Sequence, residues 1–134
     1  MQRILVFTQD REWRKRIELQ APSSDVRISF ALGPPDQASA GELESTDLVI
    51  IDTDLLPAPE SAAINRVHKI LRGKHVVAVY DPGAAVGLCE VRKSFIAGAC
   101  DLVEKPYTFN EINRVLAIER LSHSACLSVV RKDG

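Results

Sequence analysis

A short apolar run, Leu48 to Ile51, constrains the fold of this chain more than any other feature, and Asp52 ends it. Three of its four residues are β-branched, and no polar residue interrupts them. Such a run is typical of a strand covered on both faces, as in a parallel sheet between helices. Ligands of open α/β sheets bind beyond the carboxyl ends of the strands, so Asp52 is a candidate site residue. The alternative is that Asp52 only caps the following loop.

Strand-like and helix-like segments alternate along the rest of the chain, which implies parallel strands joined by right-handed crossovers. The second strand alternates apolar and polar residues, so it is predicted to lie at a sheet edge. The helix over 36–44 is weak, and the helix over 84–97 is predicted to turn Leu88, Val91 and Phe95 inward. Strands are predicted at 4–7, 26–30, 48–51, 76–80 and 102–103, and helices at 11–20, 36–44, 60–72, 84–97 and 108–121.

Composition excludes several classes of protein. The chain has 134 residues, of which 46% are hydrophobic and 26% charged, as in one ordinary globular domain. The net charge of −1 predicts no attraction to nucleic acid or to a membrane surface. Three cysteines without a CxxC spacing argue against a disulfide framework or a zinc cluster. No signal peptide and no apolar run of about 20 residues is found, so we expect a cytoplasmic protein.

A second pattern lies at residues 97–107, which read Ala-Gly-Ala-Cys-Asp-Leu-Val-Glu-Lys-Pro-Tyr. Together with the strand that ends at Asp52, this pattern resembles the response regulator receiver domain (CheY-like). The resemblance covers residues 3 to about 121. It implies an α/β three-layer sandwich of the flavodoxin-like type, with a five-stranded parallel sheet in the order 2-1-3-4-5. Residues 1–121 would form the receiver-like domain, and 122–134 a C-terminal tail or the start of a linker.

The resemblance implies a phosphoryl-transfer site at which Asp52 is the phospho-acceptor and Lys105 pairs with the phosphoryl oxygens. A carboxylate that attacks a phosphoryl group needs its developing charge neutralised. In the family, Mg²⁺ held by carboxylates supplies part of that neutralisation, because this ion prefers oxygen ligands. A Ser or Thr hydroxyl after the fourth strand then binds the phosphoryl group and rearranges the surface.

The metal-binding part of this pattern is altered. The family's acidic pair after the first strand falls on Thr8 and Gln9, which carry no charge. Asp10 follows and could hold a cation weakly with Asp54, but Asp10 is equally well explained as a helix cap. We therefore expect Mg²⁺ to bind weakly at best.

The switch positions are altered as well. The hydroxyl position falls on Tyr80, and the aromatic position three residues before Lys105 falls on Leu102. Asp81 adds a negative charge where a phosphoryl group would lie. The acceptor and the lysine are kept, while the metal and switch parts are changed.

Two interpretations follow, and we favour the first. In the first, the chain is a degenerate receiver, or pseudo-receiver, that acts through protein–protein interaction, with Asp52 and Lys105 as a structural ion pair. In the second, Asp52 is still phosphorylated, with a histidine kinase among the candidate partners.

Enzymatic interpretations are weaker. Asp52-Thr53-Asp54 resembles the Asp-x-Asp of haloacid-dehalogenase-like phosphatases, but it lies on the third strand and Leu56 stands where those enzymes have Thr. No GxGxxG, Walker or flavodoxin-like phosphate loop is present, so no nucleotide or flavin is expected. We assign no catalytic residue and expect no enzyme.

The resemblance implies that a partner, or a second copy in a homodimer, binds to the face formed by the fourth helix, fifth strand and fifth helix. Its charges are of both signs, which suits a specific contact better than polyanion binding. The alternative is that they only solvate the surface. The residues of this face are Arg92, Lys93, Asp101, Glu104, Glu111, Asn113 and Arg114.

Overall fold

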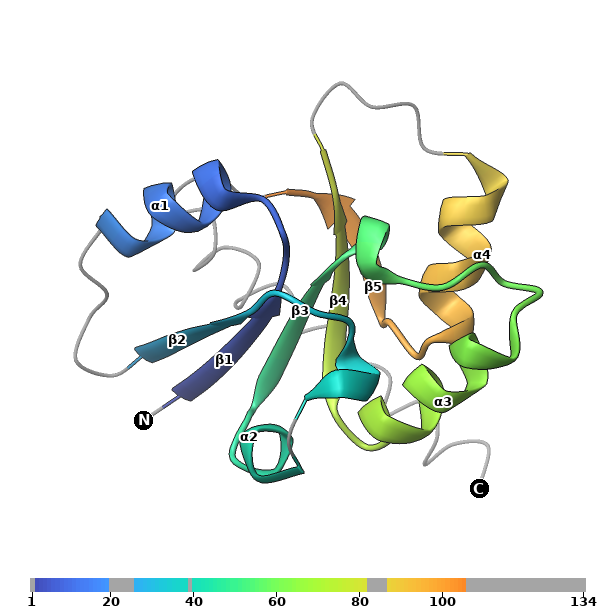
Figure 1. Ribbon diagram of the computed structural model, residues 1–134, viewed down its shortest axis with the longest axis horizontal. Coiled ribbons are helices and arrows are strands. Elements are labelled where there is room, and N and C mark those ends of the chain that lie inside the picture. Colours follow the sequence, from blue (N-terminus) through green and yellow to red (C-terminus); the bar gives the residue numbers. More distant parts are fainter. Residues whose placement is uncertain (1, 20–25, 39, 82–86, 106–134) are drawn as a thin grey trace, which may run out of the picture.

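The computed structural model describes residues 2–19, 26–38, 40–81 and 87–105. Its sheet has five parallel strands in the order β2-β1-β3-β4-β5, which confirms the predicted topology (Figure 1). The strands are β1 Gln2–Phe7, β2 Val26–Ala31, β3 Leu48–Asp52, β4 His75–Tyr80 and β5 Asp101–Glu104. The helices are α1 Arg11–Leu19, α2 Ala40–Glu44, α3 Ala62–Leu71 and α4 Leu88–Ile96, with 3-10 turns η1 Pro35–Gln37 and η2 Thr53–Leu55.

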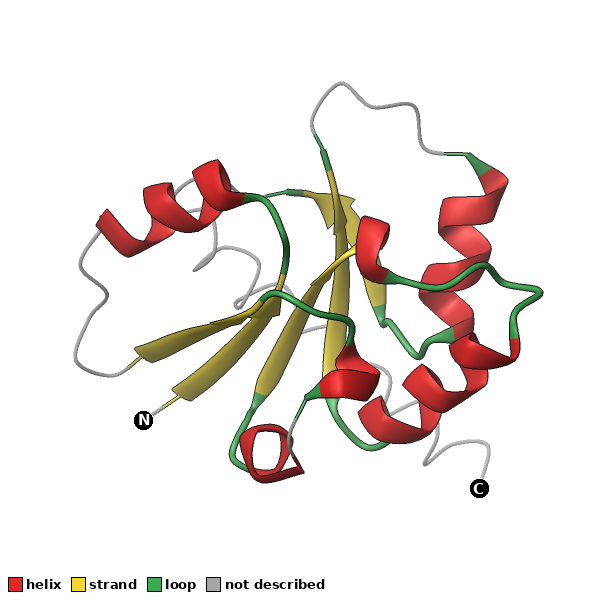
Figure 2. Ribbon diagram, in the orientation of Figure 1, coloured by secondary structure: helices red, strands yellow, loops and turns green. Residues whose placement is uncertain are grey.

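Helices cover both faces of the sheet, and every residue of β3 is buried between them, as the apolar run predicts (Figure 2). On one face, Trp13 and Ile17 of α1 pack against β1, β3 and β4. On the other face, Ile64 and Val67 of α3 pack against the opposite side of the same strands. The result is a three-layer sandwich with two apolar cores.

The edge position of β2 is confirmed, since its first four residues alternate between half-buried and exposed. The weak helix predicted over 36–44 is split into η1 and the short α2, and Leu43 is the buried residue of α2. Because α2 is so short, it covers little of the sheet face formed by β1 and β2. This leaves room for a hollow beside the first residues of β1 and β2.

Local signals fix the ends of α3. The Ser61 hydroxyl accepts a hydrogen bond from the Ala63 N–H at 3.1 Å, so the helix begins two residues later than predicted. After the helix, Gly73 has a φ of +80°, the left-handed conformation for which glycine is favoured. Gly73 therefore occupies the position directly after the C-cap of α3.

The predicted inward face of α4 is wrong. Leu88 is 74% exposed and Phe95 is 53% exposed. The buried side chains are Lys93 and Ser94, which form a stripe of helical spacing with the buried Ala97. This stripe can face the core because its polar atoms are satisfied within the helix: Ser94 Oγ donates to the Glu90 carbonyl at 2.7 Å, and Lys93 Nζ pairs with Glu90 Oε2 at 2.9 Å.

The helix predicted over 108–121 and the predicted boundary between the domain and its tail at 121 lie outside the residues that the structure describes. In the described ranges, no helix is both long and apolar enough to cross a membrane.

Candidate functional site

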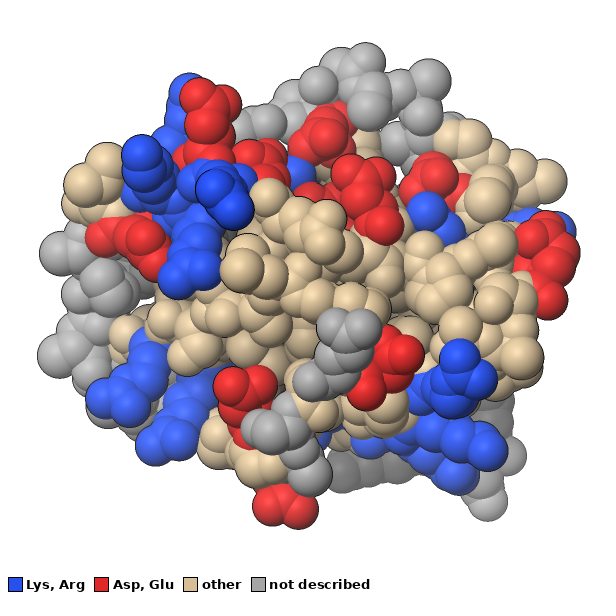
Figure 3. Space-filling view, viewed as in Figure 1, with Lys and Arg blue, Asp and Glu red and all other residues tan. Residues whose placement is uncertain are grey.

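Four side chains from distant parts of the chain meet at the carboxyl end of the sheet. Asp10 follows β1, Asp52 ends β3, Asp81 follows β4 and Lys105 follows β5. Lys105 Nζ lies 2.8 Å from Asp52 Oδ2, 2.6 Å from Asp81 Oδ1 and 3.2 Å from Asp10 Oδ2. The predicted juxtaposition is therefore present, because the ends of parallel strands lie along one edge. Figure 3 shows acidic side chains gathered at this end of the molecule.

Lys105 is buried, with only 1% of its side chain exposed. An ammonium group has three N–H donors, and three carboxylates surround this one. The ammonium also lies over the Trp13 ring, 5.0 Å from its centroid, and the Lys105 backbone N–H donates to the Tyr80 carbonyl at 2.7 Å. The ammonium group and the backbone of Lys105 are therefore both held by contacts within the protein.

Lys105 stays protonated at neutral pH. Burial acts to lower the pKa of Lys105, but its hydrogen bonds to Asp52 and Asp81 outweigh burial. The charge of Asp52 and the hydrogen bond to Asp10 act in the same direction, so the pKa of Lys105 lies well above its usual 10.5. Lys105, Asp10, Asp52 and Asp81 together form a charged cluster, and its lysine carries a positive charge at neutral pH.

Asp52 is also nearly inaccessible, with 5% of its side chain exposed. Its Oδ2 atom faces Lys105 and accepts a hydrogen bond from Thr8 Oγ1 at 3.2 Å. Its Oδ1 atom accepts from the Asp54 N–H at 3.4 Å, which caps η2. Asp52 therefore caps the following loop and also lies beside Lys105, so its role as a loop cap does not exclude a role in the site.

Thr8 and Asp10 tie the end of β1 to the cluster. The buried Thr8 hydroxyl accepts from the Asp10 N–H at 3.0 Å while it donates to Asp52. Asp10 Oδ1 accepts from the Trp13 N–H at 3.1 Å, so the predicted helix cap is confirmed. Burial raises the pKa of Asp10, but the bonds from the Trp13 N–H and Lys105 outweigh it, and the pKa is lowered.

A hollow of about 260 Å³ opens beside these residues. Burial, followed by the charges of Asp52 and Asp81, raises the pKa of Asp54 on its wall. One ammonium group therefore faces four carboxyl groups, and the hollow is acidic. Its lining residues are Gln9, Asp10, Asp52, Asp54, Leu55, Asp81 and Lys105.

Solved structures with similar folds identify the architecture. The chemotaxis response regulator CheY4 of Vibrio cholerae matches with a TM-score of 0.62 and 11% identity, over 89% of this chain and 98% of that one. The chain has the receiver-domain fold. A protein described as pilus assembly-related, from Burkholderia pseudomallei, matches this fold with a TM-score of 0.65 and 19% identity over 91% of both chains. A pilus assembly protein from Burkholderia thailandensis gives 0.59 and 19%, over 90% of this chain and 98% of that one.

Sequence comparison adds nothing to this fold assignment. No protein-family model matches the chain, and no curated protein matches its sequence.

The Mg²⁺ implied by the resemblance does not fit this version of the receiver fold. One Asp10 oxygen caps α1 and the other holds Lys105. The Lys105 ammonium lies among the carboxylates that would have to bind the ion. Within the described part of the chain, no three Asp, Glu, His or Cys side chains form a group that could hold a metal.

The two switch positions lie apart from the hollow. Tyr80 is half-buried at the end of β4, and Leu102 packs against the core on the α3 side of the sheet. Neither residue lines the hollow. A group bound in this hollow would therefore not contact the side chain of Tyr80 or Leu102.

The predicted interaction face changes in one residue. Lys93 is buried and paired with Glu90, so its assignment to an exposed face is wrong. Arg92 and Glu104 are exposed, and Asp101 is half-buried. The three residues predicted on the fifth helix, Glu111, Asn113 and Arg114, lie outside the described ranges.

Two contributions to the site were not predicted from the sequence. Trp13 packs in the core, and its ring also lies beneath the Lys105 ammonium. From the sequence, Thr8 was noted only because it lacks the negative charge of the family's acidic residue, but its hydroxyl donates a hydrogen bond to Asp52. Their positions in the sequence place both residues near the end of β1, but only the side-chain geometry shows these contacts.

Proposed function

We propose that this chain is a receiver-like regulatory domain in signal transduction that acts by binding a protein partner rather than by accepting a phosphoryl group. The observation that carries the proposal is the Lys105 ammonium, which already holds Asp52, Asp81 and Asp10. In a phospho-accepting site, the corresponding lysine must be available to the phosphoryl oxygens. Here its three donors are used within the protein.

The electrostatics of the hollow support the same proposal. A phosphoryl group carries negative charge, and its transfer depends on positive groups placed around it. Thr8 and Gln9 supply no carboxylate for a cation, while Asp54 and Asp81 add negative charge to the wall. An incoming phosphoryl donor would meet repulsion rather than neutralisation.

The similar structures are consistent with a binding role. Two of them are described as pilus assembly-related proteins, and others are response regulators. A receiver fold in assembly proteins supports the view that such a domain can serve as a docking module. A partner protein or a second copy of the chain is therefore the ligand that we propose.

Phosphorylation by a small-molecule donor tests this function. The chain is incubated with acetyl phosphate and Mg²⁺, and its intact mass is followed with time. We expect no mass gain at Asp52. Stoichiometric gain in the wild type that is absent from Asp52→Asn would establish the phospho-accepting interpretation instead. Hydrolysis of a phosphate ester that Asp52→Asn abolishes would favour the phosphatase interpretation.

A further inference from the structure

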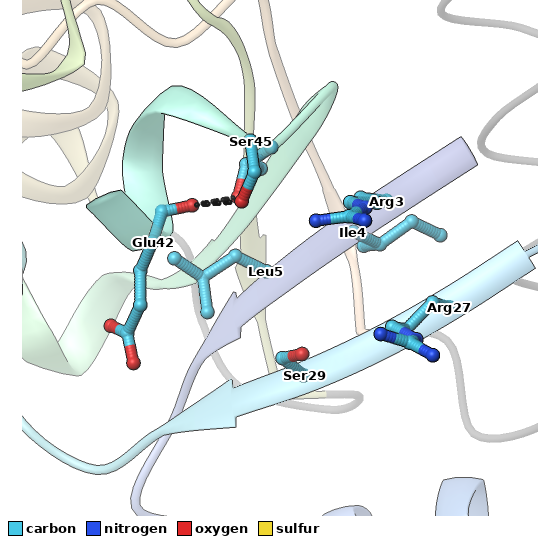
Figure 4. A pocket seen from close by; sticks show the side chains of 8 residues that line it. Arg3, Ile4, Leu5, Arg27, Ser29, Glu42 and Ser45 are labelled. Carbon is cyan, nitrogen blue, oxygen red and sulfur yellow. Dashed lines mark hydrogen bonds between the residues drawn. The ribbon is translucent and has the colours of Figure 1, made fainter. Parts of the chain in front are cut away.

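A second hollow, of about 140 Å³, lies at the opposite end of the sheet from Lys105. It opens beside the first residues of β1 and β2, where the short α2 leaves the sheet face uncovered (Figure 4). The proposed function does not use it. Its lining residues are Arg3, Ile4, Leu5, Arg27, Ser29, Glu42, Ser45 and Thr46.

Two arginines stand side by side at this hollow. Arg3 and Arg27 are register partners on the neighbouring parallel strands β1 and β2, so they project from the same face of the sheet. Both are exposed, and neither guanidinium group forms an ion pair within the described part of the chain. Like charges in such positions repel each other. An anion between them would remove this repulsion.

Within the described residues, neither arginine forms an ion pair with a nearby carboxylate. Figure 4 shows the Glu42 carboxylate directed away from both arginines. Asp47 Oδ2 accepts from the backbone N–H of Arg3 at 2.8 Å, which holds β1 to the start of β3. Lys74 Nζ adds a further positive charge at this end, 3.3 Å from the Thr46 carbonyl.

The hydroxyl groups around the hollow have different roles. Thr46 Oγ1 donates to the Glu42 carbonyl at 2.6 Å, and Ser45 Oγ donates to the same carbonyl at 3.2 Å. These two bonds fix the wall formed by α2. Ser29 projects from the same face as Arg27, and its exposed hydroxyl has no hydrogen-bond partner in the described ranges, so it can donate to a ligand.

We propose that this hollow binds a phosphate group through Arg3, Arg27 and Ser29. Two guanidinium groups present several N–H donors in the planar arrangement that matches phosphate oxygens. A serine hydroxyl completes the donor set, and the small volume suits a compact anion. The phosphate can be free inorganic phosphate or the head of a small phosphate monoester, because both present the same oxygens.

Thermal unfolding and amide NMR of the full chain test the proposal. Inorganic phosphate and glycerol phosphate are each compared with acetate and chloride at equal ionic strength. Phosphate should raise the Tm above the chloride value, since binding to the native state stabilises it, and should shift the amide signals of Arg3, Arg27 and Ser29. An equal effect of glycerol phosphate would show that the site admits monoesters, and a weaker effect would assign it to free phosphate; both support the site.

The variants separate binding from structure. Arg3→Gln and Arg27→Gln should each weaken phosphate binding at least about tenfold, because each removes charge-assisted hydrogen bonds. Without phosphate, neither should lower the Tm, since each removes a like-charge pair. The control Arg66→Gln, on exposed α3 surface, should keep the phosphate effect. If phosphate raises the Tm no more than chloride or acetate does, the proposal is overturned. The same holds if the phosphate effect survives in the double variant Arg3→Gln/Arg27→Gln.

Discussion

Lys105 Nζ lies 2.8 Å from Asp52 Oδ2, and both side chains are almost fully buried at the carboxyl end of the sheet. In the receiver pattern that the sequence resembles, the equivalent pair brackets the phosphoryl group. Here Asp81 and Asp10 complete the surroundings of the same ammonium, so the lysine neutralises the protein's own carboxylates. This relationship determines both the stability and the chemistry expected of the site.

Removing the lysine should destabilise the fold. Lys105→Met leaves three neighbouring carboxylates without their counter-charge, and breaking a buried ion pair in this way costs about 3 kcal/mol. We take the lower end of the range because Asp81 is half exposed and water screens it. Urea unfolding at neutral pH measures the loss.

Two further variants test that explanation. Lys69→Met, on the exposed surface of α3, should change the free energy of unfolding little. The double variant Lys105→Met/Asp52→Asn should lose less than the sum of the two single losses, because the uncompensated charge is gone. Additive losses would show that Lys105 and Asp52 do not act as a pair.

Asp54→Asn should raise the Tm at neutral pH. The pKa of Asp54 is raised above its usual 3.8, so its charged form is less favourable in the folded chain than in the unfolded one. This penalty is present above the folded pKa and absent below 3.8. The Tm difference between variant and wild type should therefore vanish at acid pH, and Asp36→Asn, at an exposed position, should show no difference. A lower Tm at neutral pH would mean that the Asp54 charge stabilises the site.

Asp10 should contribute the opposite pH dependence. The pKa of Asp10 is lowered, so its stabilisation is present above 3.8 and is lost as the pH falls through its folded pKa. Asp10→Asn keeps a side-chain oxygen that can cap α1 but removes the charge facing Lys105. The variant should be less stable at neutral pH, and its stability should fall less steeply with acid. An unchanged acid limb of the unfolding curve would contradict this role.

Association should depend on the outer face of α4. Leu88, Arg92 and Phe95 lie on one side of this helix at helical spacing and are exposed. Arg92→Glu should weaken self-association or partner capture at least about tenfold, whereas Arg66→Glu on α3 should leave it unchanged. Light scattering and a pull-down with the wild-type chain as bait measure both. Equal association by the two variants would exclude this face.

The sequence predicted the sheet and the meeting of the site residues because both follow from strand patterns. The apolar run before Asp52 and the spacing to Lys105 determine which strand ends lie at one edge. The inward face of α4 could not be predicted, since two stripes of that helix have helical spacing and packing selects between them. The bond from Thr8 to Asp52 likewise depends on side-chain geometry.

The arginine hollow was not predicted for a related reason. Arg3 and Arg27 look like ordinary surface residues until the register of β1 and β2 places them side by side. The shortness of α2 then leaves them uncovered. Neither fact is visible in the spacing of residues along the chain.

The fluorescence of Trp13 tests the central claim most directly, because this is the only tryptophan in the chain and its ring lies 5.0 Å from Lys105 Nζ. The chain is titrated with Mg²⁺ in the presence of beryllofluoride, an analogue of the phosphoryl group. If Lys105 is held by the three carboxylates, the emission should stay unchanged into the millimolar range. A saturable change at sub-millimolar Mg²⁺ that is lost in Asp52→Asn would contradict the account.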